Sequence, residues 1–174
     1  MTELLIPKYL TKAIALQAIY VALYAVMGKN GPLRPRPKRN HCHIVILVPG
    51  MEDACEGEYP DWPNYPLTPV LLCEYGYNCG DAWEHPYDSI ARCKALQLWT
   101  GRNDGRAGVI PHLLFPGDTP YWGGVKRDGI VVACSGVEPY FDRLIAGIVC
   151  DTLIALAHDA YEKDPERKVV DFLP

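Results

Sequence analysis

Hydrophobic residues occur in short runs whose spacing changes between that of a helix and that of a strand. Ala13 to Met27 is apolar almost all round a helix, with Thr11 placed to cap its start and Gly28 to end it. His41 to Val48 is a β-branched run closed by Pro49-Gly50, as is typical of a strand. The remaining pattern predicts strands over 70–75, 121–125 and 130–134, a helix over 87–100, and a last helix that begins at Pro139.

The order of these elements indicates the fold class. A helix, two strands, a helix, a hairpin and a final helix contain no βαβ repeat, so we expect an α/β (α+β) fold with a mainly antiparallel sheet flanked by helices. The length of 174 residues suits one domain, 1–174. Two irregular stretches interrupt it: a basic, proline-rich loop over 28–40 and a long inserted loop over 50–69.

Composition and charge narrow the class of protein. The net charge of -4 disfavours general nucleic-acid binding, and no apolar run reaches the ~20 residues of a membrane span. Seven cysteines without a CxxC pair indicate reduced thiols in the cytoplasm. Lys8 and Lys12 precede the apolar run 13–27, so a secretory signal is the alternative to a buried helix. No small-residue cleavage site follows, which favours the helix.

The first helix also bears on assembly. A helix without a polar face must be covered on several sides, either by its own sheet or by another subunit. A homo-oligomer is therefore one of the two ways in which the chain could bury this helix.

Two histidines give the chain a candidate metal site. His41 and His43 form an H-x-H pair in a strand, which places both rings on one face at ~7 Å between Cα atoms. Both can ligate one divalent metal or flank one haem, with Glu74 or His85 as a third ligand. The alternative is that both are simply solvated at the end of the strand.

A second group of residues could carry acid–base chemistry. Glu74, Asp81 and His85 lie close in sequence around the turn before the second helix. Arg102 and Arg106, in a glycine-rich segment, could hold a substrate carboxylate. The alternative is a capping turn, whose acids complement the start of the helix.

Three further residues are candidate ligand contacts. Asp118 and Tyr121 lie in the glycine-containing stretch 117–124, where a ligand can approach closely. Glu138 opens the last helix, where backbone amides favour anions. Cys134 ends the preceding strand, and without an evident base it is interpreted as a buried thiol rather than a nucleophile.

Several of these motifs resemble those of a known family. The helix segment 90–95 (IARCKA), the glycine pair Gly123-Gly124, the strand 129–136 (GIVVACSG) and Asp142 are similar to the GlcG/HbpS-like family, which includes the C-terminal domain of the PduO adenosyltransferases. The likeness covers about 81–161, weakens over 9–48 and is absent over 50–69.

The resemblance implies a profilin-like fold, a homo-oligomer and, for some members, haem binding or a place in haem or cobalamin metabolism. The chain departs from the family where Pro49-Gly50 and residues 51–54 replace a short helix, and its glycine hairpin is shorter. No haem-ligand motif of the family transfers to named residues here.

These observations lead to one expected function and two alternatives. We expect a cytoplasmic homo-oligomer that binds a small-molecule ligand, haem or a related organic compound, in a pocket lined by His41, His43 and His85. The first alternative is an enzyme that acts on a small polar metabolite through Glu74, Asp81 or His85, with a metal as a further option. The second is a scaffold without a ligand, assembled through its first helix.

Overall fold

The computed structural model describes residues 4–34, 36–51, 67–80, 83–103 and 110–168. This part of the chain contains three α-helices, four strands and two short 3-10 helices. In chain order they are α1 (Lys12–Met27), β1 (Cys42–Gly50), β2 (Thr68–Tyr77), α2 (Tyr87–Trp99), a 3-10 turn (Pro111–Leu113), β3 (Gly124–Arg127), β4 (Ile130–Ser135), α3 (Pro139–Lys163) and a second 3-10 turn (Pro165–Lys168).

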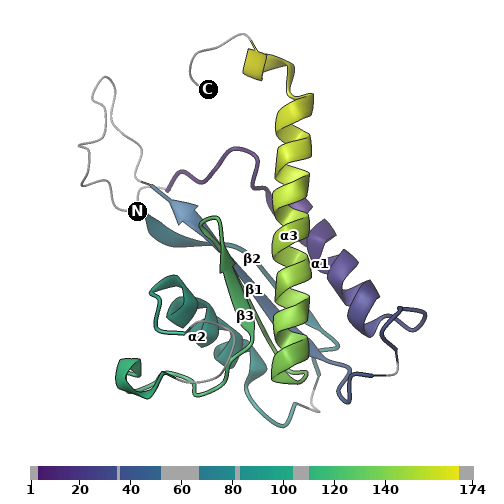
Figure 1. Ribbon diagram of the computed structural model, residues 1–174, viewed down its shortest axis with the longest axis vertical. Coiled ribbons are helices and arrows are strands. Elements are labelled where there is room, and N and C mark those ends of the chain that lie inside the picture. Colours follow the sequence, from purple (N-terminus) through teal and green to yellow (C-terminus); the bar gives the residue numbers. More distant parts are fainter. Residues whose placement is uncertain (1–3, 35, 52–66, 81–82, 104–109, 169–174) are drawn as a thin grey trace.

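The four strands form one antiparallel sheet in the order β2-β1-β4-β3 (Figure 1). α1 and α3 cover one face of the sheet, and α2 covers the other. The predicted α+β class with a mainly antiparallel sheet is therefore confirmed.

The position of β1 explains its uninterrupted apolar sequence. β1 lies inside the sheet, between β2 and β4. Its side chains alternate between two cores, with Ile44 and Ile46 against α1 and α3, and Val45 and Leu47 against α2. Because both faces are covered, a polar side chain at any of these positions would lose its contact with water, so the alternation of a half-exposed strand is missing.

The hairpin between β3 and β4 is tighter than the sequence suggested. The expected four-residue connector 126–129 is a two-residue turn at Asp128-Gly129, and Lys126 and Arg127 pair with Val131 and Ile130. Asp128 and Gly129 have φ angles of 48° and 80°. Two successive positive φ angles match the right-handed twist of the flanking strands, which is why Asp-Gly allows the shortest loop.

The two longest strands extend into the stretch expected to be a loop. β1 continues through Pro49 to Gly50, and β2 already begins at Thr68. β4 pairs with β1 only as far as Leu47, so Pro49 has a strand on one side alone, where proline is tolerated. Residues 52–66 of the expected inserted loop lie outside the described part of the chain.

Two helices bear on the membrane question. α1 begins after Thr11, whose hydroxyl accepts a hydrogen bond from the Ile14 amide at 3.4 Å, and it packs on α3 as a core helix. α3 is long and apolar enough to cross a bilayer by length and composition, with about a third of its most apolar stretch buried. A core helix passes the same test, and α3 packs along α1, β3 and β4.

Candidate functional site

A buried ion pair joins α2 to the start of α3. Lys94 is 1% exposed and Asp142 is 3% exposed. The Lys94 ammonium lies 3.2 Å from the Asp142 carboxylate and also donates a hydrogen bond to the Cys134 carbonyl at 2.8 Å. The other oxygen of Asp142 accepts from the Val137 amide at 3.0 Å. Three elements, α2, β4 and α3, are therefore tied together by charge-assisted hydrogen bonds.

Gly123 makes room for this pair, and Gly136 makes room for the start of β1. Gly123 has a φ of +123°, and a Cβ there would lie 2.7 Å from Cβ of Asp142 and 3.3 Å from Nζ of Lys94. Gly136 has a φ of +129°, and its Cβ would lie 2.8 Å from both Cα of Cys42 and the His41 carbonyl. Both positions combine a left-handed backbone with a close approach, so only glycine fits them without strain.

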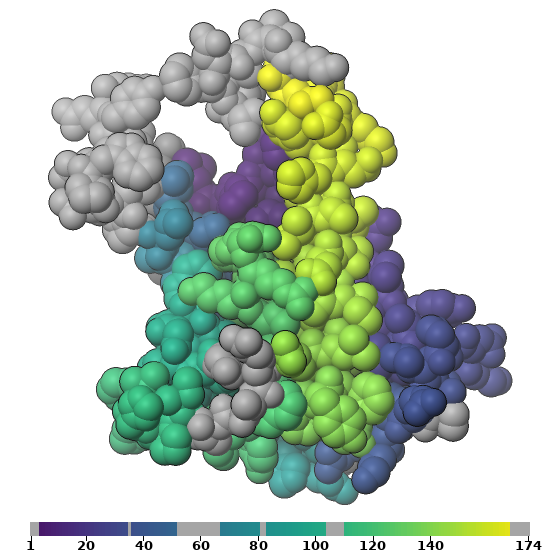
Figure 2. Space-filling view, in the orientation of Figure 1, coloured from purple at the N-terminus to yellow at the C-terminus, as the bar shows by residue number. Residues whose placement is uncertain are grey.

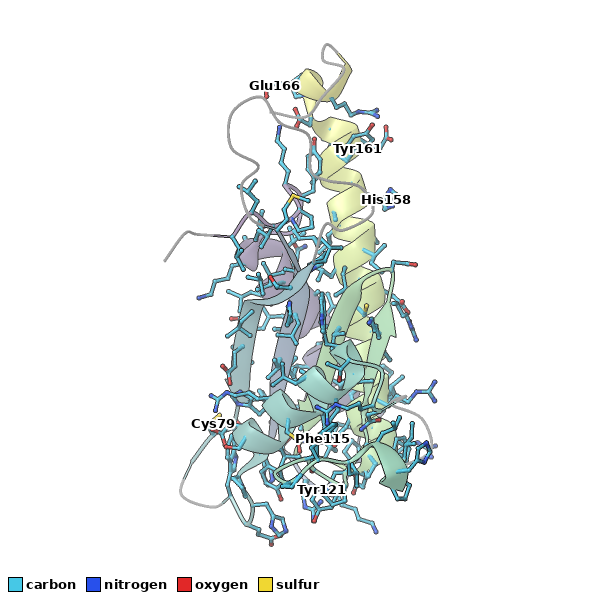
Figure 3. All side chains as sticks on the ribbon, turned by 90° about the vertical axis from the view of Figure 1, so that its left-hand side faces the viewer. Cys79, Phe115, Tyr121, His158, Tyr161 and Glu166 are labelled. Atoms are coloured by element: carbon cyan, nitrogen blue, oxygen red, sulfur yellow. The ribbon has the colours of Figure 1, made fainter. Side chains whose placement is uncertain are left out.

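A cavity of about 240 Å³ opens above the ion pair. Lys94 and Asp142 lie at its base, and Arg39, His85 and Tyr121 belong to its exposed part. Figure 3 shows Tyr121 below α2, at one end of the molecule. The full lining is Arg39, His85, Tyr87, Ile90, Lys94, Tyr121, Ser135, Gly136, Val137, Pro139 and Asp142.

Five rings gather beside the cavity around Tyr87, the first residue of α2. The Tyr87 ring lies 5.0 Å from His41, 5.6 Å from Trp83 and 5.9 Å from His85, between ring centroids. Trp83 in turn contacts His43 at 6.0 Å. His41 was expected in the strand but precedes β1, which begins at Cys42, and its ring lies 6.5 Å from that of Trp83.

The Tyr87 hydroxyl is a buried polar group without a partner among the described residues. Tyr87 as a whole is 4% exposed. Burial raises the pKa of Tyr87, against a smaller opposite effect of the Arg39 charge, so the hydroxyl keeps its proton. A buried hydroxyl without a partner costs roughly 1–3 kcal/mol.

The charges around the cavity favour an anion. Arg39 approaches Glu84 at 3.9 Å and donates to the Val137 carbonyl at 3.1 Å. The first turn of α3 faces the same space through Pro139 and adds the positive end of a 25-residue helix. Burial raises the pKa of Asp142 while Lys94 and the Val137 amide lower it, and the effect of burial prevails.

His43 and Glu74 belong to a charge network that runs from the buried His43 to the exposed Arg92. Nε2 of His43 lies 2.5 Å from the Glu74 carboxylate, which also binds Arg92 at 2.6 Å, and Arg92 pairs with Asp88. Glu74 thus meets His43 as the sequence suggested, but its other partner is a guanidinium. Among the described residues no three His, Cys, Asp or Glu side chains are grouped to hold a metal ion.

The remaining predicted site residues have partners within the protein or lie outside the described residues. Arg102 pairs with Asp118, and the Phe115 amide donates to the same carboxylate at 2.9 Å. Glu138 accepts from the Lys38 amide at 3.1 Å beside the cavity wall. Asp81 and Arg106 lie outside the described residues.

The cysteines that the structure describes are free. Cys134 is fully buried, and burial raises its pKa well above the usual value, as expected of a structural thiol. Cys93 is only partly buried, and its sulfur accepts a hydrogen bond from the Thr119 amide at 3.1 Å.

Sequence reasoning missed the residues at the base of the cavity. A lysine at position 94 falls at helical spacing among Ala91, Ala95 and Leu98, on the face of α2 that turns toward the sheet. An ammonium on a buried helix face requires a partner. The spacing of Lys94 therefore indicated a buried ion pair before the structure was known. The partner, 48 residues later, could not be found by spacing.

The environment of His41 predicts a pH-dependent stability. Burial, and then the charge of Arg39, lowers the pKa of His41 below its ordinary 6.5, against a smaller effect of Glu84. The stability that the neutral His41 ring contributes is fully present above pH 6.5. It is lost as the pH falls below 6.5, because His41 then binds a proton in the unfolded chain but not in the folded chain. We expect the melting temperature to fall less between pH 7.5 and 5.0 in His41→Gln than in the wild type.

The matched control is His158→Gln on the exposed surface of α3, which should keep the wild-type slope (Figure 3). Thermal unfolding followed by circular dichroism measures all three proteins. Equal slopes in His41→Gln and the wild type would contradict the prediction.

Comparisons with family models, with curated proteins and with solved structures find no match for this chain. The resemblance to the GlcG/HbpS-like family, with the haem chemistry that it implies, therefore stays a prediction from the sequence.

Proposed function

We propose that this protein binds a small organic acid in the cavity between α2 and the start of α3. The observation that carries the proposal is the cavity that Tyr87 lines together with Arg39 and the first turn of α3, where the buried Tyr87 hydroxyl lacks a partner among the described residues. An acid would place its carboxylate toward Arg39 and the helix start, and a second oxygen at Tyr87.

The cavity volume sets the size of the ligand. A space of 240 Å³ corresponds to about eight water molecules at roughly 30 Å³ each. This suits a ligand of about eight to twelve non-hydrogen atoms, just below the drug-sized range. A haem is several times larger, and Nε2 of His43 already faces Glu74, so these residues favour a smaller ligand than haem.

The proposal predicts a ligand-dependent stabilisation that Tyr87 controls. A panel of aliphatic and aromatic mono- and dicarboxylates of this size is screened by thermal shift, and the best acid is measured by calorimetry. We expect Tyr87→Phe to weaken its binding about tenfold, since one hydrogen bond to a charged group is worth about 1.5 kcal/mol or more. Tyr87→Phe should leave the unliganded protein folded, because it only removes an unpaired hydroxyl.

Tyr140→Phe is the matched control, since Tyr140 is 57% exposed and does not line this cavity. It should bind the acid like the wild type. Failure of every acid to shift the melting temperature, or equal binding by Tyr87→Phe, would reject the proposal. A haemin titration is run in parallel: a Soret shift lost in His41→Ala would replace the small acid by haem.

A further inference from the structure

A thiol and an imidazole come together where β2 ends. Cys79 lies in the turn that leads from β2 to α2, and it is the exposed one among the free cysteines of the described chain. Figure 3 shows Cys79 at the edge of the molecule beside α2, and the segment between β2 and α2 reaches the surface at the lower end in Figure 2. Neither Cys79 nor its neighbours His43 and Glu74 line the cavity of the proposed function, so this region is independent of it.

The turn folds Cys79 back over Gly76, which is the residue paired with His43 in the sheet. A Cβ at Gly76 would overlap Sγ of Cys79 and would lie 3.4 Å from Nδ1 of His43. The missing side chain at position 76 therefore lets the sulfur and the imidazole flank the same point. Asn78 holds the turn in place, with a left-handed φ of 48° and a side-chain amide that donates to the Asn40 carbonyl at 2.8 Å.

Glu74 decides which nitrogen of His43 carries the proton. Nε2 of His43 lies 2.5 Å from the Glu74 carboxylate. An ionised carboxylate only accepts hydrogen bonds, so Nε2 donates, and Nδ1 of the neutral ring keeps a free lone pair. His43 is 8% exposed, and its Nδ1 has no hydrogen-bond partner among the residues that the structure describes. The side of the ring that faces Cys79 therefore presents a buried, unpartnered base.

The thiol requires such a base in order to react. Although Cys79 is exposed as a residue, its sulfur packs over Gly76, and this partial burial raises the pKa of Cys79 above its usual value. The thiol therefore keeps its proton at neutral pH and is a weak nucleophile until a neighbouring base removes that proton. The negative charge of Asp88 also acts on Cys79, which favours an uncharged reagent over an anionic one.

We propose that Cys79 is an oxidative modification site for hydrogen peroxide, at which His43 is the base and Glu74 positions the imidazole. The sulfur attacks one peroxide oxygen while the thiol proton passes to Nδ1 of His43. The S–O bond forms as the O–O bond breaks, and the leaving hydroxide takes the proton from His43 and becomes water. Sulfur loses two electrons and the peroxide gains them, so the product is Cys79 sulfenic acid.

The test is the rate at which hydrogen peroxide oxidises Cys79 in the intact chain at pH 7. Dimedone traps the sulfenic acid as a thioether, and mass spectrometry of the Cys79 peptide measures its formation. We expect Cys79 to react at least about tenfold faster in the native chain than in the same chain unfolded in urea, because a positioned base contributes about 10²–10⁴-fold. The partly buried Cys93 is the reference thiol within the same molecule.

Variants assign the roles of the two partners. His43→Gln removes the base and should slow the oxidation of Cys79 about tenfold or more, while Cys93 reacts as before. His158→Gln, on the exposed surface of α3, is the matched control and should keep the wild-type rate. Glu74→Leu leaves Nε2 of His43 without an acceptor and should slow Cys79 as well. Glu74→Gln still offers an oxygen to Nε2 and should restore part of that rate.

Three outcomes would overturn the proposal. The first is a native Cys79 that reacts no faster than in the unfolded chain, a measurement that decides the question even where His43→Gln does not fold. The second is a folded His43→Gln in which Cys79 is oxidised as fast as in the wild type. The third is an equal rate in Glu74→Leu and Glu74→Gln, which would show that Glu74 does not act by accepting the Nε2 proton.

Discussion

Replacing Lys94 by methionine should lower the free energy of unfolding by about 3–5 kcal/mol at pH 7, the usual cost of removing one partner of a buried ion pair. Asp142 would keep its hydrogen bond from the Val137 amide but lose the charge of Lys94. Because Asp142 is only 3% exposed, water could not replace that charge. Since a domain of this kind has only about 5–15 kcal/mol of stability, Lys94→Met should be close to unfolding. Urea denaturation at 25 °C measures the loss.

The pH dependence of this variant distinguishes lost charge from lost packing. Without Lys94, the pKa of Asp142, which burial already raises, rises further. A carboxyl group whose pKa is higher in the folded than in the unfolded chain stabilises the fold when it is protonated. The free energy of unfolding of Lys94→Met should therefore rise as the pH falls from 7 to 5. A loss that is the same at both values would contradict the charge explanation.

Two further variants complete the test of the ion pair. Lys94→Met/Asp142→Asn removes both charges and keeps an acceptor for the Val137 amide, so it should regain at least half of the lost stability. Lys163→Met removes an exposed lysine that pairs with Asp159, and it should change stability by less than ~1 kcal/mol.

Gly136→Ala should destabilise the protein by about 2–6 kcal/mol, the sum of backbone strain and overlap at about 1–3 kcal/mol each. The φ of +129° is unfavourable for alanine, and the added Cβ would lie 2.8 Å from the Cys42 Cα and the His41 carbonyl. Neither neighbour is the flexible end of a side chain, so β1 must move. Because His41 packs on Tyr87, ligand binding should weaken as well. Urea denaturation and calorimetry with the same acid measure the two effects.

Gly101→Ala separates strain from overlap. Gly101 has a φ of +73°, and an added Cβ meets nothing within 4 Å. The left-handed backbone is then the only source of destabilisation, and Gly101→Ala should lower the free energy of unfolding by about 1–2 kcal/mol. A loss in Gly136→Ala no larger than in Gly101→Ala would show that β1 tolerates the overlap.

The candidate site was only partly predictable. His85 and Tyr121 were expected to contact a ligand, and both line the cavity. Arg102 and Asp118 were expected there too, but they pair with each other. Spacing identifies residues that are able to bind. It does not tell which of them already have a partner.

The sequence by itself determined which helices and strands form, though not where each strand ends, because periodicity, caps and Asp-Gly turn chemistry act over a few residues. It also determined the sheet class and the apolar character of α1. Only the tertiary structure decided that Lys94 meets Asp142, that Tyr87 is buried without a partner among the described residues, and that one face of α1 stays open. These outcomes depend on contacts between residues far apart in the chain, which form only when α2 and α3 pack against the sheet.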